Sequence, residues 1–382
     1  MGFLIKKIFF LLILIAAFAG CGKSLIEITV NDDENPYPMF GKSSNRNFYV
    51  PLMVSDSIKL KWESEVYGNF SNSSITAYDE YIFTSDLGGR IYVFDINDGK
   101  RVGVLKSSDA IFTAPLLTKS LVIYAVAEEK NDLTDLVYYN FSAGERVYYE
   151  EIDGRTISQL AGTDDGIIFL TEDGKLYKYN YSGSSVWETI TGVTSRCSPS
   201  LENGIIIFGN DNGEVITVSE SNGQIINRKN IEGIFTASPV IDDGIVYMSN
   251  NDGKIFAINI NNLDIVWKFN TNARILMSPA IDDENVIVGN LEGTLFSINK
   301  SSGKLNWEQN FGGLFNATPL LTLNRIILPD INHSIHFIDK QTGELKKTYI
   351  LEGRAKLTPV IFKNTLFIGY DKGLLRAYEF VY

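Results

Sequence analysis

The sequence predicts an all-β protein, an eight-bladed β-propeller built of four-stranded blades. One observation is a series of prolines that recur every 40 residues: Pro199, Pro239, Pro279, Pro319 and Pro359. Toward the N-terminus, Pro115 and Ile75 extend the series. One further repeat, between Pro115 and Pro199, lacks the proline, and the equivalent position lies near Ala161. A second observation is that each repeat holds four short segments rich in β-branched and aromatic residues, separated by turn residues. Eight such repeats are typical of a propeller.

Each repeat follows one internal order. A Ser/Thr/Ala-Pro pair opens the first strand, and an Asp, Asn or Gly turn leads to a second strand such as GIVYMSN. A turn 14 residues after the proline position precedes the third strand and contains Gly89, Gly213, Gly253, Gly293 or Gly373. Another turn precedes the fourth strand and often contains glycine, at Gly99, Gly223, Gly303 and Gly343. Glycine suits these turns because tight hairpins require positive φ angles.

The two ends of the sequence indicate how the ring closes. Trp267 and Trp307 lie 28 residues after the prolines of their repeats, in the fourth strand. The eighth repeat ends before a fourth strand can form, whereas residues 58–67, IKLKWESEVY, carry Trp62 at nearly the matching position. We therefore expect a propeller over residues 58–382, closed by the N-terminal strand, which completes the eighth blade and removes exposed strand edges.

The N-terminus has the features of a lipoprotein leader, and residues 1–20 are predicted to be a signal peptide. A short positive segment precedes a 12-residue apolar run, which is shorter than the roughly 20 residues of a membrane span. The run ends in FAGC, which resembles the bacterial lipobox, with Phe18 where Leu is usual and Cys21 as the lipidated residue. The alternative is an ordinary signal peptide with an incidental cysteine.

Residues 21–57 are rich in Asn, Ser, Lys and Pro and are predicted to be a lipidated N-terminal tether between the membrane and the ring. Acyl chains on Cys21, such as palmitate, would anchor the protein firmly. Gly22 follows the cysteine in place of the Asp that retains lipoproteins in the inner membrane. The expected location is therefore the periplasmic face of the outer membrane.

The charge of the chain argues against nucleic acid as a partner. The formal net charge is −12, and removal of residues 1–20 with Lys6 and Lys7 makes it −12 − 2 = −14. Such a surface repels phosphate backbones, and no element carries a basic stripe.

Residues with catalytic or metal-binding chemistry are few. Cys197 is the only cysteine besides Cys21 and is expected to be a small buried residue at the start of a strand. His333 and His336 are spaced H-x-x-H, but in a strand residues three apart point to opposite faces, so a solvated turn is expected rather than a metal site. Asp- and Asn-rich turns such as NNDGK resemble calcium loops loosely and are expected to be hairpin turns. We expect no catalytic residue, no cofactor and no metal.

The DGKIFAIN-type repeats with a following tryptophan, together with the lipobox, resemble proteins with quinoprotein-dehydrogenase-like repeats, and among them the BamB family. The resemblance covers residues 58–382 and the leader. It implies a non-enzymatic scaffold lipoprotein of the outer-membrane β-barrel assembly machinery. Such a protein binds the POTRA domains of BamA, joins the other components of that machinery, aids insertion of outer membrane proteins and contacts nascent chains.

The resemblance also implies which residues bind the partner. In the family these contacts come from loops before the blade-opening proline, here GVTSRCSP, residues 192–199, and EGIFTASP, residues 232–239. The expected contact residues are Val193, Thr194, Arg196, Ile234, Phe235, Arg274 and Arg354. The Arg and Asp that the family uses five residues before the proline are replaced here by Thr194 and Ile234.

Position along the loop decides which of these side chains reach a partner. The residues four before the proline, Ile111, Phe235, Ile275 and Phe315, are apolar and suit either a protein interface or packing between blades. The residues five before the proline are expected to face solvent.

The residues argue against one other function, and two more remain open. A quinone dehydrogenase would need a vicinal cysteine pair and carboxylate ligands for calcium, and a lone Cys197 cannot supply the pair. The alternative function is a periplasmic propeller that binds a small molecule or saccharide in its central funnel. A third is a structural lipoprotein with another partner.

Overall fold

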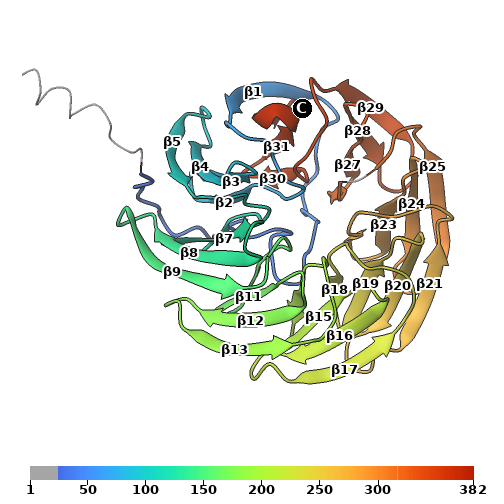
Figure 1. The fold of residues 1–382 in the computed structure, drawn as a ribbon. Helices are drawn as coiled ribbons and strands as arrows, with labels where there is room; N and C mark the ends of the chain where they lie inside the picture. Colours follow the sequence, from blue (N-terminus) through green and yellow to red (C-terminus); the bar gives the residue numbers. More distant parts are fainter. Residues whose placement is uncertain (1–24, 316) are drawn as a thin grey trace, which may run out of the picture.

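The computed structural model describes residues 25–315 and 317–382 as eight four-stranded antiparallel sheets, arranged as the blades of a ring (Figure 1). This confirms the predicted all-β propeller. Within the described residues, the 3-10 turn η1 (Asp371–Gly373) is the one helical element, and no helix is long and apolar enough to cross a membrane. The predicted signal peptide and Cys21 lie outside the described residues.

In blades 1 to 7 the strands follow the chain from the centre of the ring outward. Blade 1 contains β2 (Thr76–Tyr78), β3 (Tyr81–Asp86), β4 (Arg90–Asp95) and β5 (Arg101–Lys106). Blade 2 contains β6 (Leu116–Leu117), β7 (Leu121–Glu128), β8 (Leu133–Asn140) and β9 (Glu145–Asp153). Blade 3 contains β10 (Ala161–Gly162), β11 (Gly166–Leu170), β12 (Lys175–Asn180) and β13 (Ser185–Ile190). Blade 4 contains β14 (Ser200–Glu202), β15 (Ile205–Gly209), β16 (Glu214–Ser219) and β17 (Ile225–Asn230).

The second half of the ring repeats this order. Blade 5 contains β18 (Val240–Asp242), β19 (Ile245–Ser249), β20 (Lys254–Asn259) and β21 (Ile265–Asn270). Blade 6 contains β22 (Ala280–Ile281), β23 (Asn285–Gly289), β24 (Thr294–Asn299) and β25 (Leu305–Asn310). Blade 7 contains β26 (Leu320–Leu321), β27 (Arg325–Pro329), β28 (Ser334–Asp339) and β29 (Leu345–Ile350). Blade 8 contains β30 (Val360–Phe362), β31 (Thr365–Tyr370), β32 (Leu374–Phe380) and β1 (Ile58–Glu65).

Burial explains why the middle strands are almost wholly apolar. In blade 5, β19 and β20 are buried on both faces except at their ends, because the neighbouring blades cover them. The outermost strand β21 is mostly exposed, and Trp267 is its one buried residue. One blade by itself could not bury both of its faces, so the apolar strands require the complete ring.

A recurring Asn or Asp shapes the turn between the second and third strands. In blade 5, Asn250 Oδ1 accepts hydrogen bonds from the backbone N–H groups of Asp252 (3.1 Å) and Lys254 (3.0 Å). The same two bonds are accepted at this position in four other blades, by Asp86, Asn210, Asn290 and Asp330. The Asp- and Asn-rich segments are therefore hairpin turns, as the sequence predicts.

Neighbouring blades are joined by a tryptophan that lies over a turn glycine. Trp307 of blade 6 covers Gly343 of blade 7, where a Cβ would come within 2.6 Å of the indole. Its Nε1–H donates a hydrogen bond of 3.1 Å to the carbonyl of Lys340, three residues before that glycine. The same tryptophan, carbonyl and glycine arrangement recurs at three other junctions: Trp62 with Ile96 and Gly99, Trp187 with Glu220 and Gly223, and Trp267 with Lys300 and Gly303.

The ring closes as predicted. Strand β1 pairs antiparallel with β32, so segments from both ends of the propeller form blade 8. Trp62 on β1 then reaches blade 1, where its Nε1–H donates to the carbonyl of Ile96 at 2.8 Å. The first and last blades are thus joined by the contact that joins other neighbouring pairs.

At the junction of blades 1 and 2 the docking tryptophan is missing, and the N-terminal segment takes its place. The corresponding position in β5 is Gly103, where a Cβ would lie only 2.9 Å from the side chain of Ile26. The backbone N–H of Ile28 donates a 2.8 Å hydrogen bond to the carbonyl of Phe141, three residues before the turn glycine Gly144. These N-terminal residues therefore fill the space, and make the hydrogen bond, that a tryptophan supplies elsewhere.

The N-terminal segment then crosses the middle of the ring (Figure 1). It forms hydrogen bonds with the innermost strands of six blades, through the pairs Tyr37–Ala77, Pro38–Leu117, Ser44–Gly162, Ser44–Leu201, Asn45–Ile241, Phe48–Leu321 and Val50–Leu321. The sequence-based expectation of a tether misses this packing. Polar composition indicated a linker, but the free edges of the innermost strands offer backbone partners that no composition reveals.

Arg46 holds this segment in place. Its side chain is fully buried, and its guanidinium donates hydrogen bonds of 2.8–3.2 Å to four carbonyl oxygens, those of Phe40, Gln159, Leu160 and Pro199. Burial lowers the pKa of Arg46 to about 10, so the group is still charged at neutral pH. Within the described residues it forms no ion pair with a carboxylate, and four carbonyl dipoles and the ring of Phe40 face its charge.

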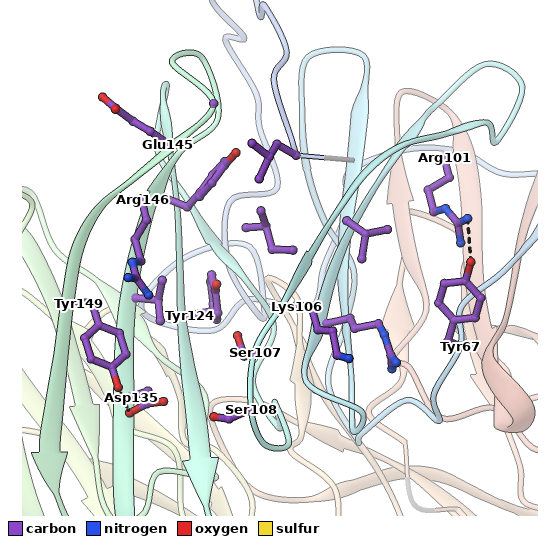
Figure 2. Close-up of a pocket in the computed structure, with 17 residues that line it drawn as sticks. Tyr67, Arg101, Lys106, Ser107, Ser108, Tyr124, Asp135, Glu145, Arg146 and Tyr149 are labelled. Atoms are coloured by element: carbon purple, nitrogen blue, oxygen red, sulfur yellow. Dashed lines mark hydrogen bonds between the residues drawn. The ribbon is translucent and has the colours of Figure 1, made fainter. Parts of the chain in front are cut away.

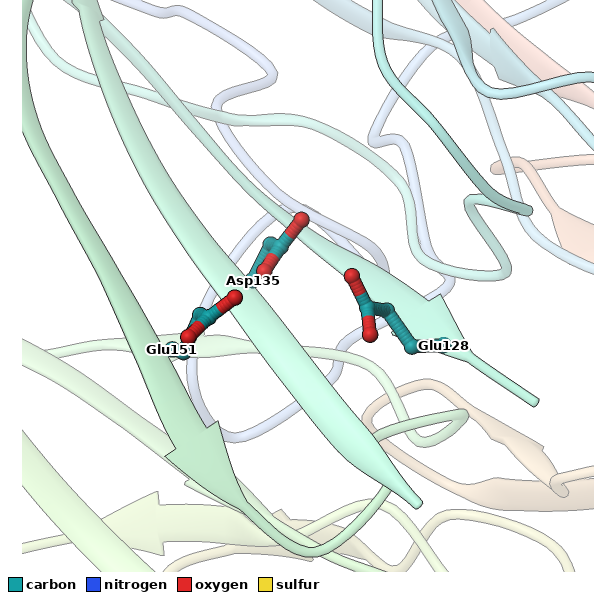
Figure 3. Close-up of side chains that lie close together, drawn as sticks. All are labelled: Glu128, Asp135 and Glu151. Atoms are coloured by element: carbon teal, nitrogen blue, oxygen red, sulfur yellow. The ribbon is translucent and has the colours of Figure 1, made fainter. Parts of the chain in front are cut away.

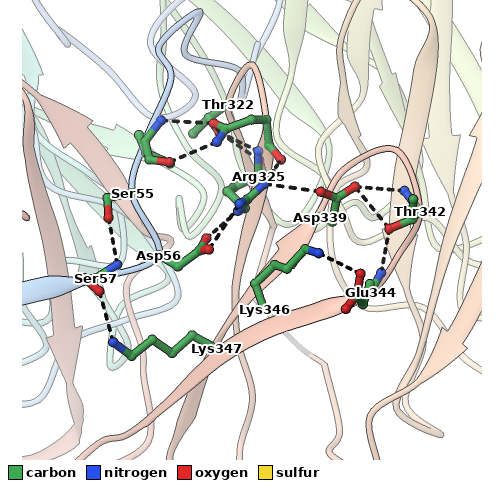
Figure 4. A network of polar contacts seen from close by, with 12 residues as sticks. Ser55, Asp56, Ser57, Thr322, Arg325, Asp339, Thr342, Glu344, Lys346 and Lys347 are labelled. Atoms are coloured by element: carbon green, nitrogen blue, oxygen red, sulfur yellow. Dashed lines mark hydrogen bonds and ion pairs between the residues drawn. The ribbon is translucent and has the colours of Figure 1, made fainter. Parts of the chain in front are cut away.

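An ion-pair network fastens the end of the segment to blade 7 (Figure 4). Arg325 binds the carboxylate of Asp56, with Nη2 3.1 Å from Oδ2, and its Nη1 lies 3.3 Å from Asp339. The side chain of Asn324 accepts a hydrogen bond from the N–H of Val54 and donates one to its carbonyl. Strand β1 begins immediately after these contacts, so they position the strand that closes the ring.

Substitution of Gly103 tests the replacement of a docking tryptophan by the N-terminus. Gly103→Trp is expected to displace residues 25–28, because the new indole and Ile26 need the same space. The amide of Ile28 would lose its carbonyl partner and exchange hydrogen roughly tenfold faster or more, which hydrogen-exchange mass spectrometry measures. Unchanged exchange in this segment would contradict the assignment.

The control for that substitution is Trp307→Gly. It opens the corresponding space between blades 6 and 7, where no other segment is available to fill it. It should lower the free energy of unfolding by about 3–5 kcal/mol, the usual cost of deleting a large packed aromatic side chain.

Candidate functional site

The loops before the prolines surround a funnel in the middle of the ring, with a cavity volume of about 360 Å³. Phe40 of the N-terminal segment also lines it, so the segment that crosses the ring forms its floor. The walls come from equivalent positions in successive blades, because the repeat places one register of every blade around the same axis.

Small hydroxyl side chains line this funnel at the position directly before the proline. In five consecutive blades these residues are Ser198, Ser238, Ser278, Thr318 and Thr358. The hydroxyl of Ser198 accepts a hydrogen bond of 2.9 Å from the backbone N–H of Gln159. The fold thus gathers into one cavity hydroxyl groups that are 40 residues apart in the sequence.

Three cationic side chains, Arg196, Arg274 and Lys356, also line the funnel. Arg196 lies at its mouth, 3.2 Å from a carboxylate oxygen of Asp211. The described residues of the wall include no Asp or Glu. This excess of positive charge contrasts with the net charge of −12 for the whole chain.

The structure places the expected partner-binding residues at different depths. Thr194, Ile234, Arg274 and Arg354 are exposed, as expected for the position five before the proline. Val193 is half-buried, and Arg196 is exposed. Arg354 points away from the funnel to Asp371, with Nε 3.1 Å from Oδ2.

Phe235 requires a correction, because its side chain is fully buried and cannot touch a partner. It packs between blades, where a Cβ on Gly209 would lie 2.4 Å from it. Ile111, Ile275 and Phe315 are buried in the same way, so packing between blades accounts for the whole set.

The sequence-based predictions did not identify the loop position whose side chains face the cavity. The residues three before the proline line the funnel in several blades, among them Arg196, Thr236, Leu276 and Lys356. The 40-residue period could have grouped them, but no sequence pattern shows which register turns inward. Leu276 and Leu314 are also more than a third exposed, so together with Ile234 they put apolar side chains around the mouth.

Burial and hydrogen bonding describe the surroundings of Cys197 and of the two histidines. Cys197 is fully buried, and burial raises the pKa of its thiol to about 12, which suits the predicted structural role. His333 is exposed in a turn, as expected. His336 differs from the expectation, since it is buried on β28 with Nε2 3.0 Å from Asp330 and Nδ1 3.0 Å from Thr348.

The sequence of this chain matches the model of a known protein family. A family model described as outer membrane protein assembly factor BamB matches residues 172–278 and 264–379, which together span more than half of the chain. The chain belongs to the BamB family. No curated protein sequence matches it.

Solved structures share the fold of this BamB-family chain. BamB from Moraxella catarrhalis is 13% identical with a TM-score of 0.71, over 85% of this chain and all of that one. A quinohemoprotein alcohol dehydrogenase from Pseudomonas putida is 10% identical with a TM-score of 0.76, over 93% of this chain and 83% of that one. A europium-containing methanol dehydrogenase is 8% identical with a TM-score of 0.74, over 89% of this chain and 91% of that one. At these identities the likeness shows the fold alone.

The dehydrogenases raise the question of whether a quinone with a metal ion fits the funnel of this BamB-family chain. Hard cations such as Ca²⁺ prefer carboxylate ligands, and the described wall offers none. It presents Arg196, Arg274 and Lys356 instead, which would repel a cation. The residues present therefore do not fit such a centre.

A second cleft, of about 970 Å³, lies between the outer strands of blades 1 and 2 (Figure 2). Arg101 lies over the ring of Tyr67 at 4.9 Å and donates a hydrogen bond to its hydroxyl at 3.1 Å. Arg146 lies over the ring of Tyr149 at 4.9 Å. Leu25 also lines this cleft, so the chain reaches the ring here.

Three carboxylates at one end of this region, Glu128, Asp135 and Glu151, lie within 4.8 Å of one another (Figure 3). Burial raises the pKa of Asp135, and the two neighbouring glutamates add to the rise. The hydroxyl of Tyr149 donates a 2.9 Å hydrogen bond to Asp135. We assign no metal to this cluster, because Asp135 is already partnered and Glu151 is exposed to solvent.

The raised pKa of Asp135 predicts a pH-dependent stability. Its folded pKa lies above the unfolded value, so the native state holds more protons between the two values and loses stability as pH rises through that window. Asp135→Asn keeps the acceptor for Tyr149 and should raise the free energy of unfolding at pH 7. This gain should shrink toward pH 4 in urea titrations. Glu308→Gln, at an exposed site on β25 away from this cluster, is the control, and an equal gain there would contradict the prediction.

Proposed function

We propose that this chain is a non-enzymatic scaffold lipoprotein of the outer-membrane β-barrel assembly machinery. It binds the POTRA domains of BamA, associates with the other components of the machinery and aids insertion of outer membrane proteins, which it contacts as nascent chains. Membership of the BamB family supports this proposal. The observation that carries it is the rim of the funnel, where exposed apolar and cationic residues stand on the loops that the family uses for BamA.

The composition of that rim suits protein recognition. Ile234, Leu276 and Leu314 come from three different pre-proline loops and are each more than a third exposed. Arg196 and Arg274 stand among them. Interfaces are commonly formed by apolar side chains interspersed with arginine. A saccharide site has less support, since Phe40 is the one aromatic residue among those that line the funnel, and sugars bind to aromatic faces.

The proposed location is the periplasmic face of the outer membrane, with the chain anchored through lipid on Cys21. Three residues lie between Cys21 and Leu25 in the sequence, so the two are at most about 14 Å apart along an extended chain. Because Ile26 and Ile28 are docked between blades 1 and 2, the lipid would hold that edge of the ring close to the membrane.

Affinity capture tests the partner. The lipoprotein is used as bait in detergent-solubilised native envelopes, and mass spectrometry identifies the captured proteins. BamA is expected as the main partner, and Arg196→Glu or Ile234→Asp should reduce its recovery at least about tenfold, because each puts a negative charge into the rim. Lys304→Glu and Leu305→Asp, at the opposite end of a blade, are matched controls that should retain BamA. Folded bait that captures no BamA would refute the proposal.

The lipid anchor has its own test. The mature wild-type protein should start at Cys21 and carry acyl chains, which intact-protein mass spectrometry detects. Cys21→Ser should shift the protein from the membrane fraction to the soluble fraction, because the acyl chains supply most of the membrane affinity. A wild-type N-terminus that lacks acyl chains would show that the cysteine is incidental.

A further inference from the structure

The funnel contains positive charge without matching negative charge. Arg196, Arg274 and Lys356 are in its wall, and no carboxylate is among the described residues that line it. Arg196 is partly matched by Asp211 outside the wall, whereas Arg274 and Lys356 form no ion pair within the described residues. In a cavity bounded by protein such charges are screened less than on an open surface, so their attraction for an anion is increased.

A fourth charge lies directly beneath the floor. Arg46 is fully buried and donates to the carbonyls of Gln159 and Pro199, next to the wall residues of the funnel. Its guanidinium carbon is 5.5 Å from the centre of the Phe40 ring, which lines the cavity. Its Nε has no hydrogen-bond partner. A buried cation with no counter-ion is costly, and an anion in the funnel would offset part of that cost.

The wall also offers neutral donors. Hydroxyl groups at the position before the proline, and the amides of Asn72 and Asn251, surround the cations. Carboxylate oxygens accept hydrogen bonds from hydroxyl, amide and guanidinium groups, and charge-assisted bonds of this kind are the stronger class. The set of side chains therefore matches carboxylates both in charge and in hydrogen bonding.

The mouth of the funnel distinguishes a protein from a free small anion. Leu276 lines the cavity, and Ile234 and Leu314 stand at the same loop position as Arg274, five residues before their prolines. All three side chains are apolar and exposed. A small anion would leave these side chains in water, whereas a protein loop would cover them while its tip enters the cavity.

From these observations we propose that the central funnel receives the carboxylate side chains of an acidic loop on the partner protein. The inference deepens the proposed function, on which it rests, because it assigns the chemistry of the partner at the same rim. The loop tip carries Asp or Glu toward Arg274 and Lys356, and its flanks cover the apolar residues of the mouth. Binding by this site should weaken with increasing salt, since the main attraction is electrostatic.

A labelled peptide tests this directly on the purified, lipidated full-length protein in detergent. The probe is a fluorescein-labelled peptide with three consecutive glutamates between glycines, and the same peptide with three glutamines is its control. Fluorescence anisotropy should show binding of the glutamate peptide alone. The variant Arg274→Gln with Lys356→Gln should weaken it by about tenfold or more, the order of effect seen when close charge pairs are lost.

A matched variant separates the funnel from general positive charge. Arg101→Gln with Arg146→Gln removes the same charge from the cleft between blades 1 and 2 and should leave peptide binding unchanged. Citrate is tested as a competitor of the same chemistry without a chain. Equal loss in both double variants, equal binding of the glutamine peptide, or binding of citrate without the peptide would each overturn the inference.

The two proposals fail in different ways. If the bait captures BamA but the glutamate peptide does not bind, the acidic loop is refuted and the scaffold function stands. If the peptide binds in the funnel but no BamA is captured, the funnel chemistry stands and its assignment to this machinery falls.

Discussion

The contact between neighbouring blades is the interaction on which the rest of this structure depends. An aromatic ring lies over a glycine that has no Cβ, and an N–H group donates to the carbonyl three residues earlier, as in Trp307 with Gly343 and Lys340. The contact fixes both the spacing and the rotation of one blade against the next. Tryptophans make this contact at four of the eight junctions, and the blades stand in equivalent positions around one axis. Equivalent loops therefore meet, and a funnel forms from residues 40 apart in the chain.

At one of the junctions that lack the tryptophan, the ring is connected to its N-terminal segment. Gly103 leaves a space that Ile26 fills, and Ile28 makes the missing hydrogen bond with its backbone. The same segment continues across the ring, where Arg46 binds four carbonyl groups, and it ends in the ion pair of Asp56 with Arg325. One stretch of about 30 residues therefore joins blades and forms the floor of the funnel.

Much of the candidate site could be located from the sequence, but its orientation could not. The repeat identified the pre-proline loops as a rim, and Arg196, Ile234 and Arg274 lie there. Phe235 is one residue from Ile234 and is fully buried, because in an extended loop successive side chains point in opposite directions. Sequence spacing could not tell which of the two directions leads to solvent. It also gave no sign of Arg46, since a single arginine in a polar segment has no pattern.

The sequence by itself determined the number of blades, the four strands of each, the turns and the closure of the ring by β1, because these follow from local periodicity and from glycine and proline chemistry. Only the tertiary structure decided where the N-terminal segment lies and which register faces the funnel. Those two features depend on contacts between residues more than a hundred positions apart, such as Arg46 with the carbonyl of Pro199. Such contacts form only when the blades stand around a common axis, and no local pattern in the chain encodes that arrangement.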